Sequence, residues 1–203
     1  KDVAQDALRR IHGGGVENGS RHFRSLEHLC GIRKRSPVEI AWPTIAVMAR
    51  PFLKWAGGKA KLAPQVIAAA PSSLSGYVEP FAGAAAVFFA LEAECPRIPA
   101  VLNDANAELV ETFTVLRDSH DALRDQLECV SRAYLALDDA GRRDLYYQSR
   151  ADSPGSPVGR AARFIFLNKT CYNGLFRVNA SGGFNVPHGR YKNPRIYDEA
   201  LLA

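Results

Sequence analysis

One stretch of the sequence decides the fold: Val-Glu-Pro-Phe-Ala-Gly-Ala-Ala-Ala-Val-Phe, residues 78–88. Its first residues, Val78–Phe81, predict a short strand. The Gly-Ala turn at 83–86 then predicts a sharp reversal into a helix, whose apolar face continues to Leu91. A strand that passes through a tight turn into a helix is the beginning of a βαβ unit.

The next segments continue this alternation. Ala100–Leu102 predicts a second buried strand that ends at Asn103-Asp104. An amphipathic helix follows from Asp104, and its apolar residues recur at helical spacing: Leu109, Val110, Phe113 and Leu116. Strand, helix and strand in this order predict the α/β class, with a parallel sheet and helices on its faces.

Helices and one hairpin are predicted for the second half of the chain. One helix has an apolar face made of Leu123, Leu127 and Val130. A later helix runs through residues 163–167, after a Pro- and Gly-containing loop at 152–157. Phe176–Asn179 and Phe184–Val186 flank a Gly-bearing turn, which predicts a β-hairpin.

The composition is that of an ordinary globular protein. The chain has 203 residues, of which 47% are apolar and 23% charged, so it can bury a substantial core. Its longest uncharged apolar stretch, residues 80–91, is too short for a membrane crossing of roughly 20 residues. The four cysteines lie far apart and have no metal-ligand spacing, which predicts reduced cytosolic thiols and no metal site: Cys30, Cys95, Cys129 and Cys171.

Residues 1–47 show no sustained periodicity and are interpreted as an irregular extension. They lack the charged and apolar regions of a signal peptide, so we expect a cytoplasmic protein. Met48 is the only methionine and stands just before the first patterned segment, which favours Met48 as the natural start. The basic run Arg33–Arg35 offers an alternative, a nuclear or nucleic-acid-binding signal.

Positive charge gathers near the C-terminal end. Residues 159–203 carry seven basic and two acidic residues, a net charge of +5, whereas residues 48–158 carry 11 and 14, a net charge of −3. Lys and Arg gain free energy when they displace counterions from phosphates, so this distribution suggests a polyanion-binding surface. A solvated basic face is the alternative.

The segment Phe52–Lys59 combines an aromatic ring, a Gly-Gly turn and a lysine. Trp55 offers a flat apolar wall, and Lys59 offers a charge for a carboxylate or phosphate. The segment is not a P-loop, because Leu53 stands where that motif requires its first glycine and Ala60 where it requires Ser or Thr. A simple surface turn is the alternative.

The turn at 83–86 lies where α/β proteins bind nucleotide-type ligands, at the carboxyl end of the first strand. It lacks the Gly-x-Gly-x-x-Gly pattern, which argues against a dinucleotide and a nicotinamide-dependent enzyme. A ligand without phosphates, such as S-adenosylmethionine, does not need that pattern. Asp104 follows roughly 20 residues later, where a carboxylate accepts hydrogen bonds from ribose hydroxyls. The alternative role for Asp104 is a helix N-cap.

Residues 166–177 mix aromatic, amide and cationic side chains just before the predicted hairpin. Aromatic rings stack on bases, Asn pairs with an adenine edge, and Arg binds guanine through two parallel hydrogen bonds. This mixture favours a nucleic-acid contact. Cys171 has no neighbouring His to activate it, so we expect a buried structural thiol.

Taken together in this order, four segments resemble the DNA adenine methyltransferases of the Dam and DpnII-modification type: Phe52–Lys59, Glu79–Phe88, Leu102–Asn106 and Asn168–Pro194. The resemblance implies a Rossmann-like S-adenosylmethionine-dependent methyltransferase fold, with a helical target-recognition insert and a DNA-reading β-hairpin. By position, the residues it implies at the cofactor are Trp55, Lys59, Phe81, Gly83 and Asp104. The residues it implies at double-stranded DNA, usually at GATC, are Tyr172, Asn173, Leu175 and Arg177.

The resemblance also implies a division of the chain. Residues 1–47 form the extension, 48–105 the cofactor-binding part, 106–196 the recognition insert and 197–203 the return to the catalytic domain, so the C-terminal part of the sheet is expected to be missing. The family transfers the methyl group directly to the adenine amine, without a metal.

Two positions depart from the family pattern. Ala85 replaces a usual glycine and is expected to crowd the methionine moiety. The catalytic Asp-Pro-Pro-Tyr motif does not occur, so no catalytic residue is assigned and the chain is expected to be inactive alone. A non-catalytic DNA-binding protein is the alternative function.

Overall fold

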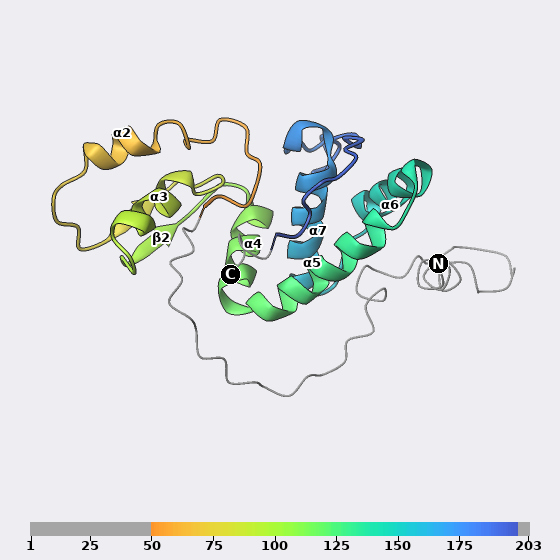
Figure 1. Ribbon diagram of the computed structural model, residues 1–203, viewed down its shortest axis with the longest axis horizontal. Coiled ribbons are helices and arrows are strands. Elements are labelled where there is room, and N and C mark those ends of the chain that lie inside the picture. Colours follow the sequence, from red (N-terminus) through yellow and green to blue (C-terminus); the bar gives the residue numbers. More distant parts are fainter. Residues whose placement is uncertain (1–49, 199–203) are drawn as a thin grey trace, which may run out of the picture.

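Helix α7 (Pro157–Thr170) is the centre of the structure, and three other helices pack around it. The computed structural model describes residues 50–198. Its other elements are α2 (Ala63–Ala68), β1 (Tyr77–Glu79), α3 (Ala86–Glu94), β2 (Ala100–Leu102), α4 (Ala107–Asp118), α5 (His120–Leu135), α6 (Asp139–Ala151) and the 3-10 turn η2 (Tyr172–Gly174). Figure 1 shows α2, α3 and β2 together at the left, and α4 to α7 bundled at the right.

The core lies where α4, α5 and α6 meet α7. Helix α7 buries most of its residues, including Phe164, Ile165 and Phe166, because apolar side chains surround it on nearly every side. The predicted apolar face of α5 is confirmed, since its three residues are all buried: Leu123, Leu127 and Val130. Burial of most of its length suits a helix in the middle of such a bundle, while Arg160 pairs with Glu111 of α4.

Polar side chains define where these helices begin and end. Asn106, Asp138 and Ser156 each accept a hydrogen bond from a backbone N–H in the first turn of α4, α6 and α7. Such N-caps satisfy donors that have no partner within the helix. At the other end of α6, the Arg163 guanidinium donates to the carbonyls of Ser149 and Arg150, both at 2.8 Å. The predicted loop at 152–157 therefore ends at a Ser-Pro cap and is confirmed.

The sheet consists of β1 and β2, which pair in parallel with Tyr77 opposite Ala100 and Glu79 opposite Leu102. Helix α3 connects them, so the predicted strand, helix and strand order is confirmed. The prediction that the second strand is buried is wrong, because Val101 keeps 60% of its surface exposed, and Val78 beside it keeps 64%. Within residues 50–198 this sheet has no third strand. The α/β class is thus correct in coarse form, while the Rossmann-like arrangement stays a prediction.

The predicted hairpin is confirmed as a short reversal. Val178 and Phe184 form an antiparallel bridge, and Asn185 N–H donates to the Arg177 carbonyl at 3.0 Å. The Asn179 side-chain oxygen closes the turn by accepting from Ser181 N–H and Gly183 N–H. This turn positions Arg177 beside Asn185.

Further predictions concern membrane crossing, the cysteines and the N-terminal extension. No helix between residues 50 and 198 is long and apolar enough to cross a membrane. Cys95 and Cys171 are free, so the prediction of reduced thiols is confirmed at these two positions, and Cys30 lies outside the described residues. The proposed extension, residues 1–47, and the Met48 start lie outside the described residues.

Candidate functional site

The turn after β1 has a backbone that suits glycine at two positions. Gly83 has a φ of 51°, and Ala85 has a φ of 54° at the N-cap of α3. Ala85 N–H donates to the Ala82 carbonyl at 2.7 Å, which tightens the turn. A Cβ on Gly83 would lie 2.7 Å from Cδ1 of the Trp55 indole. Gly83 therefore meets two requirements, a left-handed backbone and close contact with the Trp55 ring.

Asp104 holds this turn against the start of α4. Its Oδ2 accepts a hydrogen bond from Gly83 N–H at 2.9 Å, and its Oδ1 accepts from Asn106 N–H at 3.0 Å. The alternative role of Asp104 as the N-cap is wrong, because Asn106 caps α4 by accepting from Leu109 N–H. The carboxylate thus links the carboxyl ends of both strands.

Glu79 at the end of β1 supports the same turn from the other side. Its Oε2 accepts from Phe88 N–H in the first turn of α3 at 3.3 Å. Burial raises the pKa of the Glu79 carboxyl, while hydrogen bonds from Tyr77 and Phe88 oppose that rise. Burial and the nearby Glu79 charge raise the pKa of Tyr77 to about 12. Sequence reasoning placed Glu79 in the motif but assigned it no role.

Three of the five residues predicted at the cofactor are in one place. Trp55 contacts Gly83, and Gly83 is hydrogen-bonded to Asp104. Phe81 lies two residues before Gly83 and keeps 85% of its surface exposed. Lys59 is exposed in the neighbouring turn, where its Nζ donates to the Gly57 carbonyl at 3.0 Å. The turn after β1 and the loops next to it therefore offer an apolar ring, a cation and a carboxylate.

The residues predicted to contact DNA are all exposed on η2 and the hairpin: Tyr172, Asn173, Leu175 and Arg177. Asn173 has a φ of 54°, and its N–H donates to the Tyr191 hydroxyl at 3.0 Å. The Arg177 guanidinium donates from Nε to the Asn185 side chain at 2.7 Å and from Nη2 to its carbonyl at 3.2 Å. These bonds use part of the guanidinium and hold it in one orientation on the hairpin.

Comparison with known proteins identifies the family. The sequence model of the D12 class N6 adenine-specific DNA methyltransferases matches residues 55–203. The chain belongs to this family. Its matched part contains both groups of predicted site residues.

The relatives support the same assignment. The chain is 42% identical over 163 residues to the type II methyltransferase M.MjaIII of Methanocaldococcus jannaschii, covering 75% of this chain and 56% of that protein. It is 39% identical over 158 residues to the type II methyltransferase M1.LlaDCHI of Lactococcus lactis, covering 75% and 52%. It is 38% identical over 154 residues to a DNA adenine methylase of Haemophilus influenzae, covering 75% and 51%. The chain thus spans about half the length of the curated relatives it matches.

In this member of the adenine methyltransferase family, a buried asparagine joins the two groups of residues. Asn168 keeps 4% of its surface exposed. Its Oδ1 accepts from Lys54 N–H at 2.9 Å, and its Nδ2 donates to the Lys54 carbonyl at 2.7 Å. The same Nδ2 approaches the Gly174 carbonyl at 3.4 Å. Asn168 is therefore a structural residue, and Asn173 is the exposed amide of this segment.

Trp55 continues this link through ring contacts. Its indole stacks on Phe176, which follows η2, with 5.8 Å between ring centroids and 24° between the planes. Gly174 has a φ of 62°, and any Cβ there would overlap the Lys54 side chain. The segment before the cofactor turn and the start of the hairpin are thus packed together. Sequence reasoning missed this contact. Its only signal in the sequence is an amide, Asn168, near the end of α7.

Cys171 is confirmed as a buried thiol at the end of α7. Its Sγ lies 3.3 Å from the Leu175 carbonyl, and burial raises the pKa of the thiol to about 11. A thiol with a raised pKa is a poor nucleophile at neutral pH. In the part of the chain that the structure describes, no group of three or more His, Cys, Asp or Glu side chains is placed to hold a metal ion.

Proposed function

We propose that this chain forms the cofactor-binding and target-recognition part of a site-specific DNA adenine methyltransferase. The observation that carries the proposal is the contact of Trp55, Gly83 and Asp104 at the carboxyl ends of two parallel strands. Open α/β sheets bind their ligands at this edge. Membership of the adenine methyltransferase family gives the reaction class.

The residues present fit S-adenosylmethionine. Each carboxylate oxygen of Asp104 accepts one backbone hydrogen bond, so each keeps acceptor capacity for a ribose hydroxyl. The exposed ring of Phe81 supplies an apolar surface for a base, and Lys59 a cation for the methionine carboxylate. Asn106 Nδ2 is buried without an acceptor among residues 50–198, which adds an unmet donor beside Asp104. When bound, the cofactor supplies an electrophilic methyl group on its sulfonium.

Ala85 does not oppose this fit. Its side chain is completely buried, so its methyl group contacts other protein atoms instead of lining an open pocket. Its left-handed backbone explains why a glycine suits this position. The sequence-based expectation of reduced affinity is therefore replaced by an expectation of local backbone strain.

The exposed residues around η2 and the hairpin form the proposed DNA-recognition surface. Tyr172 keeps 53% of its surface exposed for stacking, and Asn173 and Arg177 present polar groups for base edges. The net charge of +5 over residues 159–203 favours the phosphate backbone. We propose adenine within a short duplex site, GATC by resemblance, as the target. Helix α4 packs on α7, which supports grouping residues 106–196 as one recognition unit.

We further propose that this chain binds cofactor and DNA without transferring the methyl group. The Asp-Pro-Pro-Tyr motif that accepts the flipped adenine in the family does not occur in the sequence. Incubation with radiolabelled S-adenosylmethionine and GATC duplexes should leave the DNA unlabelled. Incorporation above that of a scrambled duplex would contradict this part of the proposal.

Trp55 provides a direct test of the cofactor pocket. The chain has two tryptophans, so a Trp42→Phe background leaves Trp55 as the only indole. We expect S-adenosylmethionine to change Trp55 fluorescence with a saturable dependence. Lys59→Ala and Phe81→Ala remove exposed side chains and should weaken binding without unfolding the chain. The matched control Lys61→Ala removes another exposed cation from the same region and should bind as the parent does.

A non-catalytic DNA-binding protein is the second candidate. The hairpin and its bridge between Val178 and Phe184 lie within the described residues, whereas Val78 and Val101 of the two strands are widely exposed. DNA binding with no fluorescence response to S-adenosylmethionine would favour this alternative. A protein that modifies or reads cellular DNA acts where that DNA lies, so we propose a cytoplasmic location, and the relatives named type II methyltransferases support a role in restriction and modification.

A further inference from the structure

A second cationic feature lies next to the proposed recognition surface. A pocket of about 340 Å³ opens between the first half of α6 and the segment that follows the hairpin. The residues that line it are Asp139, Ala140, Arg142, Arg143, His188, Arg190 and Tyr191. We propose that this pocket binds a backbone phosphate of the DNA duplex outside the base-reading contacts, an inference that rests on the proposed DNA-binding function.

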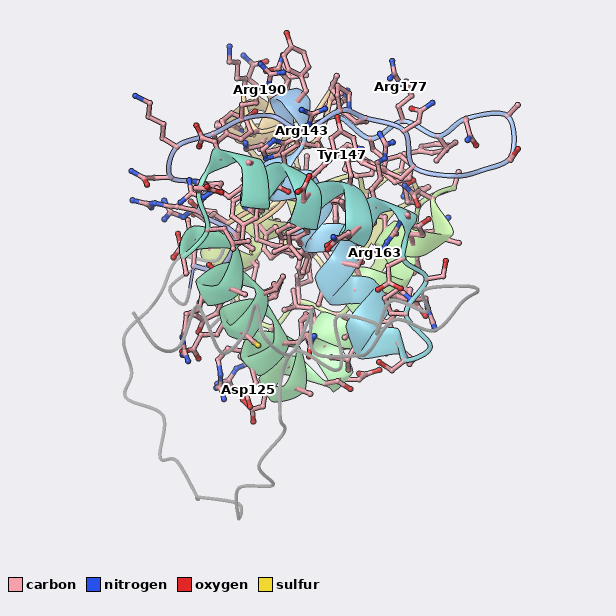
Figure 2. The ribbon with its side chains drawn as sticks, turned by 90° about the vertical axis from the view of Figure 1, so that its right-hand side faces the viewer. Asp125, Arg143, Tyr147, Arg163, Arg177 and Arg190 are labelled. Carbon is pink, nitrogen blue, oxygen red and sulfur yellow. The ribbon has the colours of Figure 1, made fainter. Side chains whose placement is uncertain are left out.

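Two guanidinium groups of the pocket are available to a ligand. Arg143 and Arg190 are exposed, and among residues 50–198 neither has a carboxylate partner. The Arg143 guanidinium lies 5.9 Å from the centre of the Tyr147 ring, which orients it along α6. Figure 2 shows Arg143, Tyr147 and Arg190 on the same side of the molecule as Arg177 of the hairpin. A phosphate is the ligand that such unpaired, oriented guanidinium groups suit.

Arg142 belongs to the wall of the pocket and not to its binding groups. Its Nε and Nη2 donate to the Tyr134 and Leu135 carbonyls at the end of α5, and its Nη1 donates to the Lys192 carbonyl at 2.8 Å. These bonds join α5, α6 and the segment after the hairpin. Because carbonyls do not neutralise its charge, Arg142 still contributes to the positive potential. Asp139 is the one carboxylate among the lining residues.

The backbone at Arg190 is held in an unfavourable conformation. Its φ is 53°, in the left-handed region that arginine rarely adopts. The preceding Gly189 is packed so closely that a Cβ there would lie 2.6 Å from the Cys171 carbonyl oxygen. Strained residues of this kind cluster at binding sites, where the surrounding structure maintains them. Arg190 is one of the residues that line the pocket.

The pocket is continuous with the recognition surface through Tyr191. The Tyr191 hydroxyl accepts from Asn173 N–H at 3.0 Å, and its ring lies 4.3 Å from Lys54 Nζ. A wall of the pocket thus touches a residue predicted to contact DNA. This continuity selects a phosphate of the same duplex over a phosphate free in solution.

The test compares Arg143→Ala and Arg190→Ala with the parent chain in fluorescence anisotropy on labelled GATC and scrambled duplexes over a series of salt concentrations. Loss of one phosphate contact should make the negative slope of log K against log salt shallower by about 0.9, which weakens binding about eightfold at about 0.1 M salt. Both duplexes should lose affinity equally. The control Arg124→Ala removes a guanidinium that pairs with Asp121 and Asp125. Figure 2 places Asp125 at the opposite end of the molecule, so this variant should bind as the parent does.

Methylphosphonate substitution then locates the phosphate. Neutralising single phosphates in the duplex should reveal one position that weakens the parent chain and has no further effect on Arg143→Ala. Unchanged affinity and slope in both arginine variants would overturn the pocket proposal while the parent still binds DNA. A loss confined to GATC would also overturn it, because that indicates base reading. Stabilisation of the parent but not of Arg143→Ala by inorganic phosphate, with unchanged DNA affinity, would assign the pocket to free phosphate instead. A parent chain that binds no duplex would overturn the proposed function itself.

Discussion

Replacing Asn168 with aspartate tests the contact that joins the cofactor turn to the recognition segment. The substitution keeps the shape of the side chain but converts a donor, Nδ2, into a charged acceptor. In the parent this donor makes a 2.7 Å hydrogen bond to the Lys54 carbonyl and a weaker one, at 3.4 Å, to the Gly174 carbonyl. The variant would hold a carboxylate oxygen against the Lys54 carbonyl at a site that is 4% exposed.

The expected cost follows from these contacts. A lost hydrogen bond with its acceptor left buried costs about 1–3 kcal/mol, and burying the new charge adds to it, so we expect Asn168→Asp to lower the free energy of unfolding by about 2–4 kcal/mol. With a urea m-value of about 2 kcal/mol/M, the midpoint should fall by about 1–2 M. The cost should shrink at low pH, where a protonated carboxyl can donate again.

Urea unfolding of the full chain, followed by circular dichroism, measures this change. Asn179→Asp is the matched control, because the Asn179 side chain only accepts, from Ser181 N–H and Gly183 N–H, and a carboxylate accepts equally well. The control should stay within about 0.5 kcal/mol of the parent. Equal midpoints for the two aspartate variants would refute the reasoning, since they would show that the Asn168 donor contributes nothing.

Three further predictions concern the turn, the hairpin and pH. Gly83→Ala should destabilise the chain by about 2–4 kcal/mol in the same urea assay, because of left-handed strain and overlap with Trp55. The control Gly182→Ala has a φ of 78° but open space around it, so it should show the cost of the strain alone. Equal losses in the two variants would exclude a contribution from the Trp55 contact. Arg177→Ala should cost about 1–3 kcal/mol of binding on GATC and little on a scrambled duplex, with a smaller loss for Asn185→Ala; equal loss on both duplexes would reject base reading. Burial and the neighbouring Arg190 and Arg143 charges lower the pKa of His188 below its usual 6.5, so the unfolded chain binds the proton more readily and stability should fall as pH drops below about 6.5. His188→Gln can keep a hydrogen bond to the Tyr134 hydroxyl and should flatten that pH dependence, whereas an unchanged slope would exclude His188 as its source.

The parts of the fold that the sequence predicted depend on local patterns. Ala100–Leu102 forms a strand with the predicted bounds, because Asn103-Asp104 follow directly and end it. The apolar face of α5 follows from helical spacing alone. The hairpin follows from its turn residues, although it makes one bridge and no long ladder. Local signals of this kind were sufficient to order the elements.

The features that escaped prediction depend on residues far apart in the chain. Asn168 and Lys54 are separated by 114 positions, and apart from the amide at the end of α7 neither segment indicates their pairing. Asp104 was predicted to face a ligand, yet it also holds Gly83 N–H, 21 residues away. The exposure of Val78 and Val101 depends on which elements cover the sheet, and an apolar strand pattern cannot report that. These features depend on burial and on tertiary hydrogen bonds, which residue spacing in the sequence does not determine.

Hydrogen–deuterium exchange of the full chain, alone and with S-adenosylmethionine or a GATC duplex, tests the central claim most directly. The cofactor should slow exchange in the turn at residues 82–88 and around Asn106, where the backbone amides of Gly83 and Asn106 bond to Asp104. The duplex should protect residues 172–177 and the hairpin, and a scrambled duplex should protect them less. Unchanged exchange in the turn at saturating S-adenosylmethionine, or duplex protection confined to other parts of the chain, would contradict the account.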